Sequence, residues 1–345
     1  MNRRRGEGMG LEFCWMLPEG DTDRIVRQTR LAEEYGFNAV LVINANEYMD
    51  PWIVATILAG QTERLRILVA QNTSYTLPTT MAKAQQTLNL LTGGRVDVNI
   101  VTGSSAIEMG KMAKTAEHSL RYRRTKEFLT LYSRLLQGIT NFQGEFFEVQ
   151  NADLHPKTDT RGSVFLAGSS LDAMEAAAAH ADYYLVFGHE FETIRGQFTE
   201  FQGLVSSQRA RPKCGIMIDV IARETSEAAW AAAHRYAEQT SPFQKRMNRL
   251  FRNNCDSVGM NRYHDYYKGI AQPESSTLWG GLSQLNTSNG MSIVGSYEEV
   301  RDTLLRYHEL GTHYFILSGL AGPEEMKHIG EHVLPLVETD RAQVC

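Results

Sequence analysis

The sequence predicts an α/β fold in which a parallel sheet closes into a barrel. Short apolar runs alternate with longer segments whose apolar residues recur at helical spacing. This alternation favours parallel pairing, because parallel neighbours need a crossover segment between them. Eight apolar runs are present, and eight strands are the number that closes a (β/α)8 TIM barrel.

Each predicted strand is rich in Val, Ile, Leu, Phe or Tyr, the residues that suit a buried sheet. The strand candidates are residues 13–17, 39–43, 67–70, 96–101, 164–167, 183–187, 216–222 and 314–317. The segments between them carry apolar residues three and four positions apart, as amphipathic helices do. The helix candidates are residues 23–35, 51–63, 78–91, 120–136, 171–180, 226–239 and 297–310.

Two insertions interrupt this rhythm. Residues 139–160 are typical of a hairpin that turns around Gln143-Gly144. Residues 240–292 are long, irregular and placed before the eighth strand, so they predict a lid over the catalytic face of the barrel. We expect residues 1–345 to form a single TIM-barrel domain, with residues 1–10 as a disordered lead-in.

Composition excludes several classes of function. Hydrophobic residues make up 42% and charged residues 22% of the 345 residues, as in ordinary soluble globular proteins. The net charge of −5 gives no electrostatic reason to expect nucleic acid or an anionic membrane as a partner. The apolar run from Leu11 to Leu17 is too short for export or for a membrane span. Four widely spaced cysteines lack metal-ligand spacing, which predicts reduced thiols and a cytoplasmic location.

Residues 95–104, RVDVNIVTGS, are the most informative stretch of the chain. As a strand they place Val96, Val98 and Ile100 on one face, and Asp97 and Asn99 on the other. A strand buried on both sides is expected to be apolar throughout. Polar groups near its carboxyl end therefore indicate that this face opens onto a site; a pair of satisfied core polar residues is the alternative.

Further candidates follow from the rule that catalytic residues lie at the carboxyl ends of barrel strands. Gly168-Ser169-Ser170 ends one strand and opens a helix, a combination that suits phosphate, although a plain serine cap has the same pattern. His118 and Tyr122 are four residues apart at a helix start and share a face.

Asp219 lies within an apolar strand, so its carboxylate must be paired, protonated or open to a cavity. A catalytic or substrate-orienting role and a structural ion pair both remain open. The chain contains no G-x-G-x-x-G, P-loop, G-x-S-x-G or H-E-x-x-H motif. Chemistry that depends on those motifs is not expected.

Together these segments resemble the bacterial luciferase-like flavin monooxygenases, and most closely the alkanesulfonate monooxygenase branch. The similarity extends from Phe13 to Leu336. It rests on residues 94–104 and 117–122, Glu127-Phe128, and residues 50–52, 168–170, 220–225, 256–259, 278–281 and 317–319.

The resemblance implies a barrel that binds reduced FMN (FMNH2) at its carboxyl face and receives it from a separate NAD(P)H-dependent reductase. Dioxygen would add to the reduced ring, and the resulting flavin peroxide would oxygenate the substrate under a mobile lid. Asn99 would lie beside the isoalloxazine ring. The remaining cofactor-binding positions would be Thr102, His118, Tyr122, Gly168, Ser169 and Ser170. Relatives are often dimers or tetramers, so a homo-oligomer is expected.

Positions that bind sulfonate in that branch are replaced here. Glu19 stands where relatives carry a histidine, and Tyr48 stands where they carry a cysteine. The other replaced positions are Met217, Asp219, Asn286 and Leu320. Cations that would grip a sulfonate are lost and a carboxylate is gained. We therefore expect a neutral or cationic substrate such as an amine or amide, with Asp219 and Tyr48 orienting or protonating it.

Two other functions fit the same sequence. A deazaflavin (F420)-dependent oxidoreductase would transfer hydride on the same type of barrel without dioxygen. A non-catalytic flavin-binding relative would store or carry flavin. The lid sequence argues against the second, because a storage protein has no need to exclude water from a reactive intermediate.

Overall fold

The computed structural model describes residues 10–18, 20–103, 109–111, 117–253, 255, 257–259, 276–282, 291–319 and 324–338. Of the expected lead-in, residues 1–9 lie outside this set. Within it, no helix is both long and apolar enough to span a membrane.

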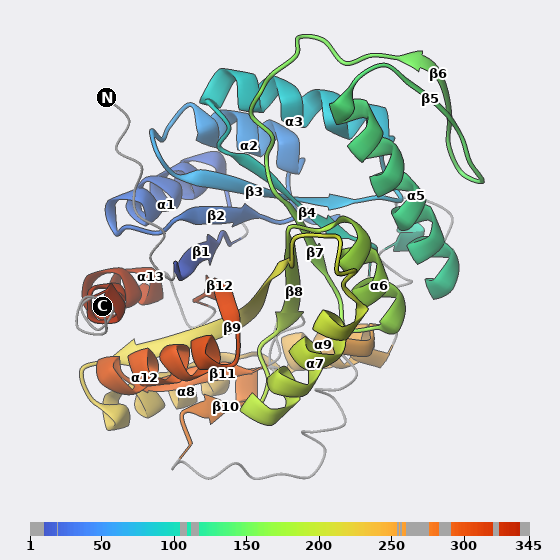
Figure 1. The fold of residues 1–345 in the computed structure, drawn as a ribbon. Helices are drawn as coiled ribbons and strands as arrows, with labels where there is room; N and C mark the ends of the chain where they lie inside the picture. Colours follow the sequence, from blue (N-terminus) through green and yellow to red (C-terminus); the bar gives the residue numbers. More distant parts are fainter. Residues whose placement is uncertain are drawn as a thin grey trace.

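Eight parallel strands form a closed barrel, as the sequence predicts (Figure 1). Their order around the barrel is β1 (Glu12–Met16), β2 (Ala39–Val42), β3 (Arg66–Asn72), β4 (Val96–Val101), β7 (Val164–Ala167), β8 (Tyr183–Phe187), β9 (Lys213–Arg223) and β12 (Thr312–Ser318). β12 pairs with β1, with Tyr314 opposite Glu12, and this pairing closes the ring. Every predicted strand is present.

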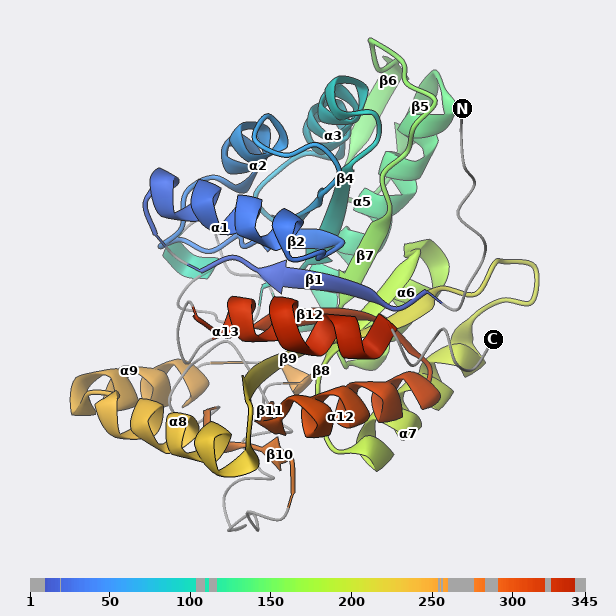
Figure 2. The ribbon, with the colours of Figure 1, turned by 90° about the vertical axis from the view of Figure 1, so that its left-hand side faces the viewer.

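Helices surround the barrel (Figure 2). They are α1 (Thr22–Glu34), α2 (Pro51–Ala59), α3 (Pro78–Thr92), α5 (His118–Gln137), α6 (Leu171–His180), α7 (Phe191–Leu204), α8 (Ser226–Gln239), α9 (Pro242–Asn253), α12 (Tyr297–Glu309) and α13 (Glu324–His328), which continues into a π-helical turn, Ile329–Val333. The sequence reading missed α7. Its buried residues Ile194, Phe198 and Phe201 have helical spacing, so the signal was available.

Local chemistry sets where helices begin. Asp50 caps α2 by accepting hydrogen bonds from two backbone N–H groups of the first turn, each at 3.0 Å, and Pro51 follows it. Ser296 and Glu299 form a reciprocal capping box at the start of α12. These caps hold each helix in place directly after the preceding strand or loop.

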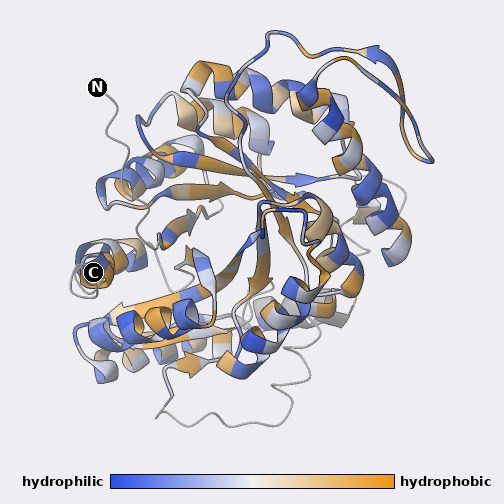
Figure 3. Cartoon of the chain, viewed as in Figure 1, coloured by the Kyte–Doolittle hydropathy of each residue, from blue (hydrophilic) through white to orange (hydrophobic). Residues whose placement is uncertain are grey.

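The barrel strands are largely hydrophobic along their length (Figure 3), and their buried apolar residues form one cluster inside the barrel and another outside it. Inside, Met16, Leu41, Phe165, Leu185 and Ile316 belong to one buried cluster. Outside, the alternate side chains of the same strands pack against the helices. The interior is therefore a packed core below the carboxyl face, as expected for a barrel of eight strands.

β9 is longer than predicted and pairs with three strands, β8, β12 and β11. Its residues up to Asp219 pair with β12, and its residues from Asp219 onward pair with β11 (Ser292–Ser296). β10 (Leu278–Trp279) then pairs antiparallel with β11. Part of the predicted lid thus extends the sheet, while its residues 260–275 and 283–290 lie outside the described residues.

The predicted hairpin region contains the antiparallel strands β5 (Thr140–Gln143) and β6 (Glu148–Ala152). The Glu127 carboxylate of α5 accepts hydrogen bonds from the backbone N–H groups of residues 145, 146 and 147, at 2.8–2.9 Å. One side chain therefore fastens the turn of the hairpin to α5.

Candidate functional site

A cavity of about 320 Å³ opens at the carboxyl ends of the barrel strands. All seven residues predicted to bind a cofactor line it. The lining residues are Ile43, Asn44, Ala45, Asn46, Asn72, Tyr75, Asn99, Val101, Thr102, Gly103, Met109, His118, Tyr122, Ala167, Gly168, Ser169, Ser170, Leu185, Val186, Phe187, Met217, Ser257, Val258, Gly259 and Ile316. The topology therefore gathers segments that are up to about 270 residues apart in the sequence.

Asn99 is a buried polar group on the cavity wall. The two faces of β4 are as the sequence predicts: Val96, Val98 and Ile100 pack toward the helices, whereas Asn99 and Val101 line the cavity. Asn99 is 6% exposed, and its Oδ1 has no hydrogen-bond partner among the described residues. Leaving a buried acceptor unmatched costs about 1–3 kcal/mol, so this oxygen indicates a missing donor, such as an N–H group of a ligand.

Another part of the cavity is rich in hydroxyl groups. Gly168 has φ 149°, and a Cβ at this position would lie 2.8 Å from the Tyr122 hydroxyl oxygen. Ser170 caps α6, with its Oγ accepting a hydrogen bond from the Ala173 N–H at 3.2 Å. Ser169 beside it is buried but lines the cavity. Residues 168–170 can therefore both cap the helix and bind a phosphate. The Ser170 hydroxyl accepts a hydrogen bond as the cap and still has a proton to donate to a phosphate.

The first turn of α5 completes this corner. The rings of His118 and Tyr122 lie 4.9 Å apart between centroids, and His118 Nδ1 is 3.9 Å from Asp172 Oδ2. Burial raises the pKa of Tyr122, so its phenol stays protonated and is available as a donor. Hydroxyls, a histidine and the N-terminus of α6 therefore converge, and this set suits a phosphate group.

Asp219 lies outside the cavity lining. It is fully buried, and the Ser318 hydroxyl donates a hydrogen bond to its Oδ1. Both residues belong to the branch point at which β9 leaves β12 and joins β11. Met217, two residues earlier on the same face, does line the cavity.

Of the other predicted site residues, Tyr48 alone belongs to the described part of the chain. Tyr48 lines a smaller neighbouring pocket of about 140 Å³. Glu19, Asn286 and Leu320 lie outside the described residues.

Several lining residues were not predicted. Asn44 and Asn72 directly follow predicted strands, so their position at strand ends was a usable signal. Asn72 Oδ1 accepts a hydrogen bond from the Ser74 N–H at 2.9 Å and shapes its loop. Met109 and residues 257–259 come from segments without clear periodicity; residues 257–259 belong to a stretch that carries the family resemblance but was given no role in the site.

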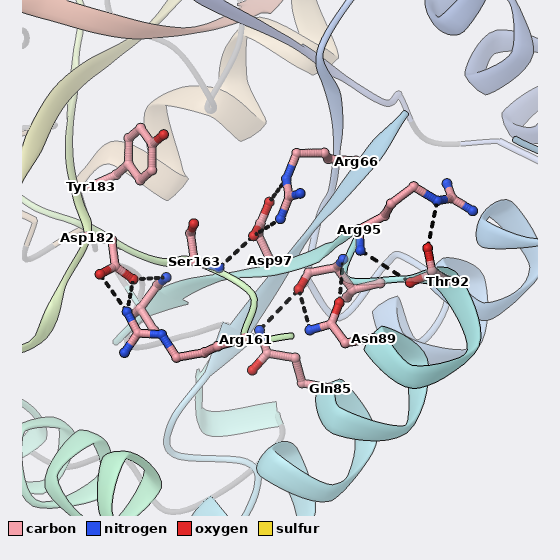
Figure 4. A network of polar contacts seen from close by, with 12 residues as sticks. Arg66, Gln85, Asn89, Thr92, Arg95, Asp97, Arg161, Ser163, Asp182 and Tyr183 are labelled. Carbon is pink, nitrogen blue, oxygen red and sulfur yellow. Dashed lines mark hydrogen bonds and ion pairs between the residues drawn. The ribbon is translucent and has the colours of Figure 1, made fainter. Parts of the chain in front are cut away.

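Asp97, the other polar residue of β4, is structural. Arg66 on β3 donates to both of its oxygens at 2.6–2.7 Å, and the Ser163 N–H donates to Oδ1 at 2.6 Å (Figure 4). The hydrogen bond to Asp97 raises the pKa of Arg66. Asp97 thus joins β3, β4 and the segment that leads into β7. Asn99, two residues later on the same face of β4, has no hydrogen-bond partner for its Oδ1 among the described residues.

The cavity fits a flavin phosphate better than a metal ion. Ala167, Leu185, Met217 and Ile316 supply apolar wall for a planar ring, Asn99 supplies an acceptor, and the hydroxyl corner supplies donors. Across the described part of the chain, no group of three or more His, Cys, Asp or Glu side chains could hold a metal ion. Ser169, Ser170, His118 and Tyr122 could hold a phosphate, and Asn99 could hold the ring.

Comparison with known proteins agrees with this geometry. Residues 10–314 match the model of the family described as luciferase-like monooxygenase. A solved riboflavin lyase, with modified FMN and riboflavin, superimposes with a TM-score of 0.79 at 17% identity, covering 96% of this chain and 92% of that chain. The EDTA monooxygenase from Chelativorans sp. BNC1 gives 0.78 at 18% identity, over 96% and 94%.

A deazaflavin enzyme also shares the fold. An F420-dependent secondary alcohol dehydrogenase in complex with an F420-acetone adduct gives a TM-score of 0.69 at 16% identity, over 95% of this chain and 99% of that chain. At these identities the likeness establishes the fold alone.

Proposed function

The chain belongs to the luciferase-like monooxygenase family, and from that premise we propose that it is an FMNH2-dependent, two-component monooxygenase. It inserts one oxygen atom from O2 into a small organic substrate. A separate NAD(P)H-dependent reductase supplies the reduced flavin, and the working enzyme is a cytoplasmic homodimer or homotetramer. The observation that carries the proposal is the buried Oδ1 of Asn99, which lacks a partner among the described residues and belongs to the same cavity as the phosphate-type corner.

The residues divide the work of binding and positioning. Ser169, Ser170, His118 and Tyr122 would bind the phosphate, and the Asn99 amide would hold the ring. The apolar wall made by Ala167, Leu185, Met217 and Ile316 excludes water from the reacting face. Reduced FMN, when bound, supplies the chemistry by activating dioxygen.

The substrate is a neutral or cationic molecule rather than a sulfonate. Among the described lining residues there is no Lys or Arg to grip an anion. Asp219, through Ser318 and its neighbours, and Tyr48, from the adjacent pocket, orient or protonate the substrate. Equal turnover of alkanesulfonates and of neutral or cationic analogues would contradict this substrate assignment.

Rapid mixing of the protein–FMNH2 complex with ¹⁸O2 tests the proposal. We expect one ¹⁸O atom in the product, detected by mass spectrometry, with candidate amines and amides as substrates. The variant Asn99→Leu keeps the side-chain volume but removes the amide. It should lower the yield of product per FMNH2 consumed about tenfold, since misplaced flavin reacts unproductively with oxygen. Absence of label in any product, with tight FMNH2 binding, would favour a flavin carrier.

F420-dependent hydride transfer is a second candidate, favoured by the shared fold of the F420-dependent alcohol dehydrogenase. The two functions differ in their cofactor. Equilibrium dialysis with FMNH2 and with reduced F420 separates them: preference for FMNH2 by tenfold or more supports the monooxygenase, and the reverse preference supports the dehydrogenase.

A further inference from the structure

Beside the cofactor cavity lies a side pocket of about 140 Å³. Its walls include Leu17 at the end of β1, Ile25 on α1, Val42 on β2 and Val54 on α2. Each of these four residues is at most 7% exposed. The walls are therefore part of the packed core and are held in place by it.

The side pocket and the cofactor cavity share a wall. Ile43 lines both hollows. Residues 44–46 of the loop after β2 face the cofactor cavity, whereas residues 47–49 of the same loop face the side pocket. The two hollows therefore adjoin each other at Ile43.

The charge at the rim is already balanced. Glu47 is the charged residue among the described walls of the side pocket, and its Oε1 lies 3.1 Å from Lys111 Nζ. A cationic group would have to displace this lysine. The four buried aliphatic walls offer nothing to an ion, so the pocket suits an uncharged apolar group.

We propose that the side pocket binds an uncharged apolar group of the substrate, of about the size of a benzene ring. The inference rests on the proposed function for the identity of the reacting site. An apolar cavity of about 150 Å³ in another protein stays dry and binds benzene, and the present pocket has nearly that volume. The substrate is then a molecule with a phenyl or branched-alkyl arm, and its oxidised atom lies beyond Ile43.

Binding of fluorobenzene to the cofactor-free protein, followed by ¹⁹F NMR, tests the proposal. We expect saturable binding that Val54→Phe weakens at least tenfold, because the larger side chain fills the pocket. The matched control is Ile57→Phe, which lies in the adjacent groove between α1 and α2 but does not line the side pocket. It should change the Kd less than twofold. Val54→Leu is a milder filler for which about threefold weakening is expected.

Three outcomes would contradict the proposal that the side pocket binds an apolar group. They are no saturable binding of fluorobenzene, no change in its Kd in either Val54 variant, or equal changes in Kd in Val54→Phe and Ile57→Phe. The last would place the probe in the groove. FMNH2 binding is measured in the same samples and should be unchanged by Val54→Phe, since Val54 does not line the cofactor cavity. If the unmodified protein does not bind FMNH2, the proposed function is contradicted, but the proposal that the side pocket binds an apolar group is not.

Discussion

Ser169 and Ser170 stand next to each other after β7, yet their side chains have different surroundings. The Ser170 Oγ accepts a hydrogen bond from the Ala173 N–H and caps α6. Ser169 is buried, with Gly259 approaching its hydroxyl. Ser170 therefore has a structural role as the helix cap in addition to its proposed role in binding. Ser169 does not cap the helix.

Ser169→Ala should weaken FMN binding about tenfold and leave riboflavin binding unchanged, because a charge-assisted hydrogen bond to phosphate is worth about 1.5–3 kcal/mol. Calorimetric titration with each flavin gives both values. Thr225→Ala is the control, since it also removes a side-chain hydroxyl but at a position that does not line the cavity. Equal weakening of both flavins would argue against a phosphate contact.

Asp219 is expected to affect turnover without touching the flavin. Asp219→Asn keeps an acceptor for the Ser318 hydroxyl but removes the charge. We expect kcat to fall tenfold or more and the Kd for FMNH2 to stay within twofold, since Asp219 lies outside the cavity lining. Steady-state kinetics and equilibrium dialysis measure the two effects. Unchanged kcat would show that the carboxylate has only a structural role.

Among the elements, the hairpin β5–β6 is held against α5 by several contacts, of which the Glu127 carboxylate is the one that binds the backbone of the turn. An isolated two-stranded sheet is only marginally stable in water, and both strands carry exposed residues. The three backbone N–H groups that bind Glu127 give the turn its anchor.

Glu127→Ala should release the hairpin turn from α5. We expect faster amide hydrogen exchange at residues 145–147 and a loss of about 1–2 kcal/mol in the free energy of unfolding. Hydrogen-exchange mass spectrometry measures the first effect. The control is Glu145→Ala, which removes an exposed ion pair with Arg123 and should change stability by less than about 0.5 kcal/mol. Equal exchange in both variants would show that Glu127 is not the anchor.

At the scale of the whole molecule, stability depends on pH through a buried histidine. Burial, followed by the positive charges of Arg209 and Lys126, lowers the pKa of His180 on α6 from 6.5 to about 4. The unfolded chain therefore binds more protons than the folded chain between pH 6.5 and 4. The contribution of His180 to stability is complete above pH 6.5 and is lost as the pH falls toward 4.

His180→Gln should abolish this part of the pH dependence. Urea titrations at pH 7 and pH 4.5 should show a drop in the free energy of unfolding that is smaller in the variant by on the order of 2 kcal/mol. His155→Gln, at a side chain that is 68% exposed, should leave the drop unchanged. If the free energy of unfolding of His180→Gln falls as much between pH 7 and pH 4.5 as that of the wild type, other groups account for the loss of stability in acid.

The local sequence pattern was sufficient to predict the barrel strands and the seven cofactor-binding candidates that line the cavity. Apolar runs located all eight strands, and the alternation in β4 assigned Asn99 to the open face and Val98 to the helix face. Asn44 and Asn72 were missed although they follow strands, because nothing local distinguishes a cavity-lining amide from a loop amide. The sequence placed Asp219 on the face of Met217, but its distance from the cavity depends on the pairing of β9 with both β11 and β12.

The sequence by itself determined the closed eight-stranded barrel, the family and seven of the residues that line the cavity, because these follow from periodicity and from motifs within single segments. Only the tertiary structure separated Asp97, held by Arg66, from Asn99, whose amide oxygen lacks a partner. It alone assigned Tyr48 to a side pocket and Asp219 to a branch point outside the cavity lining. The physical reason is that register and packing between strands distant in the sequence decide which polar groups find partners.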